Sequence, residues 1–442
     1  MNGSQDVASL LARCLRAVGA TRAFAAPGAA VELPGIDVVA VGDASLASLL
    51  ADADGRLSAA PSARPGVALL PDGRVRLSSQ PGLQVLAQPV LDAGELPVAV
   101  AAWSAGQFHT AGELDLDVEL SAPAPTGAEP LTLGAADDRL TTLSPSLAST
   151  SIALLVGPGV VRSGATAGVV EAAARTGATV VATPGAVGVL PLDHPRWAGV
   201  VGLQRDDVAL SGLADAELVL ASGLDPAESV GVVPDTAQVL EVEPGHLELM
   251  AVRWTEPSAA TPRPGPLVGA LAELSARGRA RTGLPLHPAR ALADLGEVLG
   301  PEAVVAVDAG AAGLWAGRGL LARPAGSVVV PAFPARGFAA AAALVAGIDG
   351  RAAVAVTDRG DDSVTEAVLG LAAGLGVSLT VEVWGDDVGW TDARDHRTHL
   401  VGARHEGGVQ RVPVPVDLAA TAELEQLGGP VVAWTADPTA LA

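Results

Sequence analysis

The sequence predicts an α/β fold in which parallel sheets are flanked by helices. Three short apolar runs, at 304–307, 352–357 and 379–384, are separated by segments of helical length. Continuous apolar runs at this spacing are typical of parallel strands, which are buried on both faces. Ligands of such sheets collect where the carboxyl ends of strands meet the amino ends of helices. The carboxylates clustered after the second and third runs therefore mark the candidate site.

Composition limits the classes of function. The chain has 442 residues, of which 49% are hydrophobic, so it is long enough for two to four domains. No apolar run approaches the ~18–20 residues of a membrane-spanning helix. The first residues lack the basic start and the cleavage site of a signal peptide, and we expect a cytoplasmic protein. The single cysteine, Cys14, excludes an internal disulfide and is expected in the core.

Charge argues against a nucleic-acid partner. The net charge is −22, and all 27 basic residues are arginine. Nucleic acids require clustered positive charge and often aromatic platforms, whereas this chain has no tyrosine and only four phenylalanines. The absence of lysine also excludes Schiff-base chemistry.

Three domains joined by two linkers are expected along the chain. Pro, Ser, Thr and Gly dominate the first linker, and Pro, Gly and Arg the second. The middle domain alternates apolar runs with an amphipathic helix at 165–176, which is typical of a Rossmann-like βαβ unit. In the first domain we expect helices at 6–18 and 44–52 and strands at 22–26, 36–41, 67–70 and 97–102. The predicted segments are 1–120, the linker 121–150, 151–254, the linker 255–286, and 287–442.

These segments resemble a known family in their order and motifs. VDAGAAGLWAG is similar to the TDxGxxxxWA of thiamine-diphosphate enzymes of the acetolactate synthase and 2-oxoacid decarboxylase type, and ARGFAAAAALVAG is similar to their MGFGLPAAIGA. IALLVGPGVVRSGATAGVVEAAARTGATVVATPGAVGVLPLDHP resembles their central domain. The resemblance implies three Rossmann-like domains with a shortened first one, a homodimer or homotetramer, a small-molecule 2-oxoacid substrate, and thiamine diphosphate held with Mg²⁺.

The resemblance also implies a set of cofactor-binding positions. In the family, the Asp of a GDG loop and a later Asn hold Mg²⁺, which prefers oxygen ligands. Here the GDG loop reads Thr357-Asp358-Arg359, and the chain has one asparagine, Asn2. Asp358 with Asp386 or Asp387 could hold the metal instead, although such residues are also common in solvated turns. The implied cofactor-binding residues are Asp308, Gly310, Gly337, Phe338 and Asp358, and the implied metal ligands are Asp358 and Asp386.

The catalytic acid of the family has no counterpart at its expected position. The glutamate that activates the cofactor falls on Ala44, after Val41-Gly42-Asp43. Asp43 is adjacent, but consecutive side chains point in different directions. No catalytic residue is therefore assigned.

Structural interpretations are favoured for three other motifs. Some relatives hold FAD or ADP in the middle domain, but Gly157-Pro158-Gly159 is not a complete GxGxxG and Pro158 lacks an N–H donor, so we expect a turn and no nucleotide. Asp193-His194-Pro195 matches a structural loop of the family. In the segment 391–412, His396, His399 and His405 could form a metal site, but a polar loop is favoured because no further ligand stands at a defined spacing. This segment could also form a lid.

Three hypotheses about function remain open. The first is a protein with the thiamine-diphosphate enzyme fold that has weakened or lost catalysis and serves as a partner subunit. The second is an active, Mg²⁺-dependent lyase or carboligase in which Asp43 or Glu32 supplies the acid and Arg336 or Arg359 binds the carboxylate of a 2-oxoacid. The third is a nucleotide- or small-ligand-binding protein that works through the middle domain.

Overall fold

A computed structural model describes residues 6–29, 32–57, 64–71, 73–78, 89–104, 113–131, 151–225, 227–254, 264–385 and 389–434. The chain divides into two compact units, Met1–Asp138 and Arg139–Ala442. Within the described ranges, no helix is long and apolar enough to cross a membrane.

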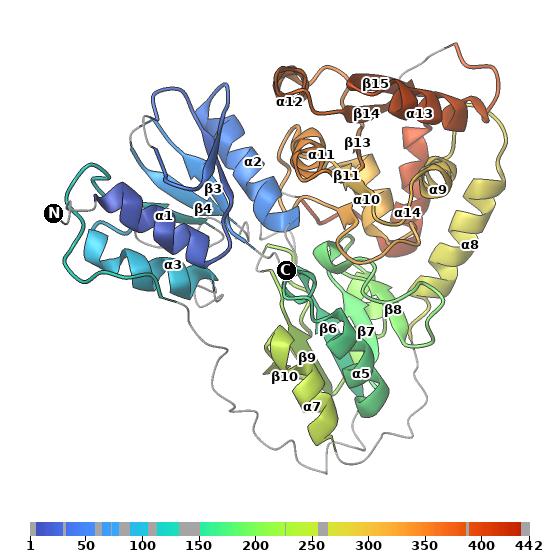
Figure 1. Ribbon diagram of the computed structural model, residues 1–442. Coiled ribbons are helices and arrows are strands. Elements are labelled where there is room, and N and C mark those ends of the chain that lie inside the picture. The colour runs from blue at the N-terminus through green and yellow to red at the C-terminus, as the bar shows by residue number, and fades with distance from the viewer. Residues whose placement is uncertain are drawn as a thin grey trace. The chain divides into compact units, whose positions relative to one another are not determined.

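The first unit is a five-stranded mixed sheet flanked by helices (Figure 1). Its strand order is β2-β1-β3-β4-β5; the pairs of β1 with β2 and β3 are parallel, and those of β4 with β3 and β5 are antiparallel. Helices α1 and α3 cover one face with a continuous apolar cluster that includes Cys14, as predicted. Its elements are α1 (Val7–Ala17), β1 (Arg22–Ala25), β2 (Asp37–Ala40), α2 (Ala44–Leu57), β3 (Gly66–Leu69), β4 (Val75–Ser78), α3 (Leu96–Ser104) and β5 (Glu113–Leu116).

The strand predicted at 97–102 is wrong, because these residues lie in helix α3. The segment is apolar on nearly every side, so its periodicity cannot separate a buried strand from a buried helix. Pro97 stands in the first turn, where a helix tolerates proline because the missing N–H would have no partner. Packing of this segment against α1 then stabilises the helical conformation.

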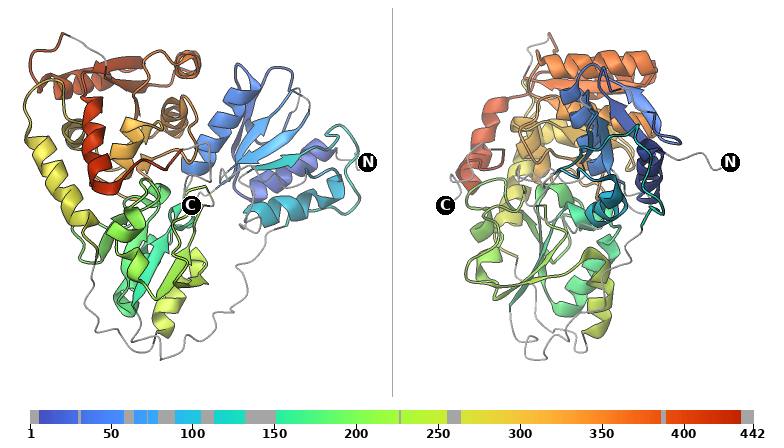
Figure 2. Two further views of the ribbon diagram at one scale, coloured as in Figure 1. Left: turned by 180° about the vertical axis from the view of Figure 1, so that it is seen from behind. Right: turned by 90° about the vertical axis from the view of Figure 1, so that its left-hand side faces the viewer.

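The second unit contains two fully parallel sheets, each of five strands (Figure 2). The central sheet has the order β10-β9-β6-β7-β8, and helices α5 and α7 pack together beside it. Its sequence expectations hold closely: β9 is Leu218–Ser222, and α5 is Thr166–Thr176. The other elements of this part are β6 (Ile152–Val156), α4 (Pro158–Arg162), β7 (Thr179–Ala182), β8 (Trp197–Val200), α6 (Asp207–Leu210), β10 (Gln238–Glu241) and α7 (Leu247–Arg253).

The third sheet has the order β12-β11-β13-β14-β15. Helices α11 and α12 pack together on one face, and α9 and α13 pack together on the other (Figure 1). The three apolar runs of the sequence are β11, β13 and β14. Its elements are α9 (Pro288–Val298), β11 (Val304–Val307), α10 (Ala311–Gly317), β12 (Val328–Val329), α11 (Phe338–Ile348), β13 (Ala353–Thr357), α12 (Ser363–Leu375), β14 (Leu379–Trp384), α13 (Asp395–Glu406), β15 (Val409–Val414) and α14 (Thr421–Gly428).

One continuous apolar cluster joins the central and third sheets. A buried ion pair crosses the same junction, where Arg318 Nη2 lies 2.7 Å from Asp207 Oδ1. Asp207 also accepts backbone hydrogen bonds from Leu203 and Gln204. Helix α8 (Leu267–Ala280) packs on α9 and occupies half of the segment predicted as a second linker. Its Pro- and Gly-rich flanks produced that expectation.

Candidate functional site at the carboxyl edge of the third sheet

Three carboxylates follow adjacent strands of the third sheet. Asp308 comes directly after β11, and Asp358 and Asp362 follow β13. Because β11 and β13 are parallel neighbours, their carboxyl ends meet at one edge of the sheet. This is the edge at which a parallel α/β sheet binds its ligands.

Asp358 caps helix α10. Its Oδ2 accepts a hydrogen bond from the backbone N–H of Ala311 at 2.7 Å. Gly310 precedes the helix with φ 132°, and a Cβ at this position would lie 2.5 Å from Asp358 Oδ2. Glycine is therefore required on two grounds, the backbone conformation and the close approach of the carboxylate. The structure thus brings together two predicted site residues, Gly310 and Asp358.

Asp308 caps helix α11 from the neighbouring strand end. Its Oδ1 accepts a hydrogen bond from the N–H of Ala339 at 2.8 Å. Burial of the carboxyl raises its pKa to about 6, and the nearby Asp362 and Asp358 carboxylates act in the same direction, whereas hydrogen bonds from Ala339 and Thr357 oppose the shift. A carboxyl that titrates near neutral pH in a ligand-binding edge is a candidate functional group.

Gly337 and Phe338, two predicted cofactor-binding residues, have packing roles at the start of α11. Gly337 has φ 70°, and an added Cβ would lie 2.8 Å from Val364 Cγ1 of α12. Phe338 is fully buried. Asp362 caps α12 through the N–H groups of Val364 and Thr365, each at 3.3 Å. All three carboxylates therefore serve helix amino ends.

The site does not offer a completed metal centre. Among the residues described above, no group of three or more His, Cys, Asp or Glu side chains could hold a metal ion. Asp386 and Asp387, the second metal ligand expected from the sequence and its alternative, lie outside the described residues. The cation recorded beside Asp358 is Arg359, whose Nε is 4.0 Å from Asp358 Oδ1. Three clustered carboxylates that already occupy helix amino ends fit an added diphosphate poorly, because like charges repel and the N–H groups of Ala311 and Ala339 are already bonded.

In the first unit, Asp43 has a structural role at the position next to Ala44. Its Oδ1 accepts a hydrogen bond from the N–H of Leu46 at 2.8 Å, so it caps helix α2, which begins at Ala44. Glu32, the other candidate acid, is exposed. This capping role explains the presence of an aspartate at position 43 without a role in catalysis.

The switch point of the central sheet is filled by backbone. The turn after β6 contacts the turn after β9: Gly159 N–H donates to Gly223 O at 2.8 Å. A Cβ on Gly157 would lie 2.5 Å from the same oxygen. Nucleotides usually enter such a fold between the two strands at which the order reverses, here β6 and β9. This close contact accords with the expected structural turn.

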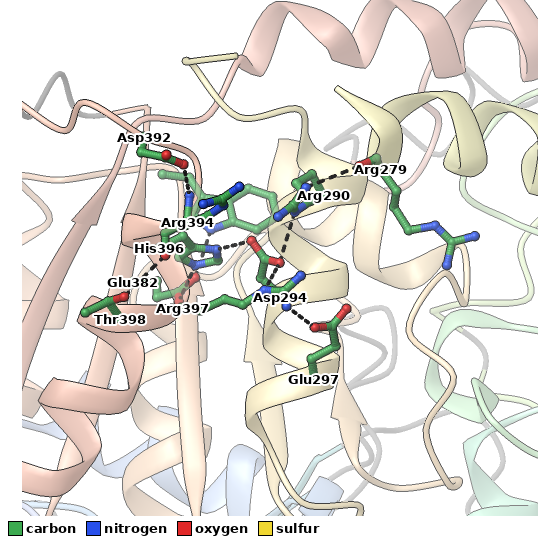
Figure 3. A network of polar contacts seen from close by, with 11 residues as sticks. Arg279, Arg290, Asp294, Glu297, Glu382, Asp392, Arg394, His396, Arg397 and Thr398 are labelled. Carbon is green, nitrogen blue, oxygen red and sulfur yellow. Dashed lines mark hydrogen bonds and ion pairs between the residues drawn. The ribbon is translucent and has the colours of Figure 1, made fainter. Parts of the chain in front are cut away.

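A buried polar network in the third domain was not expected from the sequence. The polar-loop interpretation of the histidine segment is wrong, because His396 and His399 lie on helix α13. His396 Nδ1 is 3.2 Å from Asp294 Oδ2 of α9, and its Nε2 is 2.9 Å from Glu382 Oε1 of β14 (Figure 3). All three side chains are fully buried. The glutamate within the apolar run 379–384 was the one available signal, since a buried carboxylate needs a partner.

His396 is held as an imidazolium by its neighbours. Burial alone lowers its pKa, but the Glu382 charge, together with hydrogen bonds to Asp294 and Glu382, outweighs burial and raises the pKa to about 9. Arg397 Nε also donates to Asp294 Oδ1 at 2.5 Å. His399 stacks on Trp390 with ring centroids 5.0 Å apart, and His396 stacks on the same indole at 6.0 Å. His405 is exposed.

Comparisons with known proteins agree with this architecture. Residues 147–256 match the family model for the thiamine pyrophosphate enzyme central domain. One similar solved structure, from Mycobacterium smegmatis, is described as a candidate thiamin diphosphate-dependent enzyme; its TM-score is 0.66 at 16% identity, and the alignment covers 94% of this chain and 100% of the other. No curated protein matches the sequence. The resemblance stated from the sequence is thus confirmed for the fold: this chain has the fold of the thiamine-diphosphate-dependent enzymes, and its residues 147–256 match the model of that family's central domain.

Proposed function

We propose that this protein has the thiamine-diphosphate enzyme fold without the cofactor chemistry, and that it acts through binding, as a partner subunit or regulator of an active relative. The observation that carries the proposal is the hydrogen bond from Ala311 N–H to Asp358 Oδ2. A helix amino end at the carboxyl edge of a parallel sheet is where an anionic ligand is ordinarily held. In this chain a carboxylate of the protein takes that place.

Electrostatics support the same proposal. Asp358 and Asp308 cap helices α10 and α11 at this edge, and Asp362, which caps α12, lies close enough to raise the pKa of Asp308. A diphosphate would add negative charge to a cluster that already contains three carboxylates. Two family motifs are also changed. Arg359 stands where the GDG loop has its second glycine, and Ala44 stands where the family has its catalytic glutamate.

One observation favours the active enzyme as a second candidate. Asp358 Oδ1 does not take part in the Ala311 hydrogen bond, and the side chain is 13% exposed. A carboxylate oxygen in this state could still bind Mg²⁺ with Asp386. In that case the cofactor would be thiamine diphosphate, and the reaction would be decarboxylation or carboligation of a 2-oxoacid.

A titration with thiamine diphosphate and Mg²⁺ distinguishes the two candidates. A bound ligand at 100 times its Kd stabilises a protein by about 2.7 kcal/mol, which a thermal-shift assay detects readily. We expect no shift at millimolar cofactor and no heat of binding in calorimetry. A shift that disappears in EDTA would instead establish a metal-dependent cofactor site and contradict the proposed loss of cofactor binding. ADP and FAD, tested in the same way, examine the central domain.

Asp358→Ala tests the assigned role of the carboxylate. Loss of a helix cap costs about 1 kcal/mol, so we expect the free energy of unfolding to fall by that amount. The matched control is Asp361→Ala, since Asp361 is an exposed acid in the same loop. Urea denaturation measures both variants. If the wild type binds cofactor and Asp358→Ala abolishes that binding, Asp358 is a cofactor or metal ligand and the active-enzyme alternative is favoured.

A further inference from the structure

The segment after α14 runs back over the junction between the central and third sheets. Val431 forms an antiparallel bridge with Gln204, and Val432 N–H donates to Leu203 O at 3.0 Å. Gln204 Nε2 donates to Gly429 O at 2.5 Å. These contacts fix residues 429–432 as a strap on the central domain.

The strap ends on Trp434, which has an unusual backbone conformation. Its φ is 60°, and it is the one non-glycine residue with positive φ in the described parts of the chain. A bulky side chain is disfavoured there, and such residues persist where surrounding contacts determine them. The conformation therefore points to specific contacts of the indole.

The indole lies at the carboxyl edge of the third sheet. Its Nε1 donates to the backbone oxygen of Pro331, which follows β12, at 2.7 Å. The far side of the ring lies over Gly313 of α10, where an added Cβ would be 3.0 Å from Trp434 Cη2. The same Cβ would lie 2.5 Å from Asp308 O. The Trp434 ring and the Asp308 backbone oxygen therefore both lie close to Gly313, so the indole adjoins the candidate site.

Glycine at 313 lets the indole approach helix α10 closely. A side chain at this position would meet the ring, whereas glycine leaves helix backbone against it. One wall is thus helix backbone, and the Pro331 carbonyl supplies an acceptor for an N–H donor. A planar aromatic group that carries an N–H satisfies both features.

We propose that residues 429–434 are an internal ligand of this site, in which the Trp434 indole occupies a binding place for a planar aromatic group with an N–H donor. Release of the strap opens that place to an external heteroaromatic ligand, so the two compete. The inference concerns the ring position and is independent of the diphosphate position capped by Asp358.

Binding of indole to variants of Trp434 tests the proposal. Trp434→Gly removes the ring and suits the positive φ; Trp434→Phe retains a ring as the matched control. We expect calorimetry to show saturable indole binding to Trp434→Gly that is at least tenfold tighter than to the wild type or to Trp434→Phe. Indene, which has the same two rings without the N–H, should bind Trp434→Gly at least fivefold more weakly than indole.

Equal indole affinity in the wild type and Trp434→Gly, or no binding to Trp434→Gly, would overturn the proposal. A chain that ends at Ala433 removes the ring without introducing a new residue and must give the same result, which guards against a folding defect of the glycine variant. Indole carries no phosphate and needs no metal. The outcome is therefore separate from that of the thiamine diphosphate titration.

Discussion

His396→Ala is expected to lower the free energy of unfolding by about 3–5 kcal/mol, because it leaves buried charge without its partner. Glu382 is fully buried, and its recorded contacts are His396 Nε2 and the indole N–H of Trp384. Asp294 keeps Arg290 and Arg397 in the variant, but no other cation among the described residues forms an ion pair with Glu382. Urea denaturation at pH 6 measures the loss.

The control for this experiment is His405→Ala, on the same helix. His405 is exposed, so its replacement should change stability by less than about 0.5 kcal/mol. If His396→Ala and His405→Ala behave alike, the buried network contributes nothing to stability. Because α9, β14 and α13 meet at His396, the variant should also speed hydrogen exchange in α13 first (Figure 3).

The pH dependence of this network has a definite sign. The pKa of His396 is raised from 6.5 to about 9 in the folded protein, so its stabilising contribution is complete below pH 6.5 and is lost as the pH rises to about 9. Since each pH unit between the two values corresponds to about 1.4 kcal/mol, the loss is on the order of 3 kcal/mol. Stability curves of the wild type should therefore fall across this interval, and the His396→Gln curve should fall much less.

Arg318→Leu is expected to lower the free energy of unfolding by about 3–5 kcal/mol, because it also leaves a buried charge without its partner. Arg318 and Asp207 are both fully buried, and their ion pair joins α10 to the central domain. Without the guanidinium, the Asp207 carboxylate keeps backbone hydrogen bonds from Leu203 and Gln204 but loses its cation. Thermal denaturation followed by circular dichroism measures the effect.

A neighbouring exposed pair provides the control. Arg205 and Asp206 lie 3.1 Å apart and are largely solvent-accessible, so Arg205→Ala should change stability by less than about 1 kcal/mol. The double variant Arg318→Leu/Asp207→Asn should recover part of the loss, because it removes both buried charges. Additive losses in the double variant would contradict the assigned ion pair.

Much of the architecture was accessible from the sequence. Strands β9, β11 and β14 are buried along their whole length, so each appears as a largely apolar run between glycine-, proline- or aspartate-rich turns. The runs at 304–307 and 379–384 therefore became strands with the predicted bounds. The same reasoning gave a wrong prediction for α3, because an apolar segment of nine residues shows no hydrophobic periodicity that separates a helix from a strand.

The sequence by itself determined the fold class, the positions of the parallel strands and the presence of carboxylates after the strand ends, because these follow from local patterns and from the parallel arrangement of strands. Only the tertiary structure decided what the carboxylates do. Whether Asp358 faces a ligand or the N–H of Ala311 depends on where α10 begins relative to β13, residues 47 positions apart. The His396 network and the Trp434 contact likewise join distant segments, and no local pattern records such pairings.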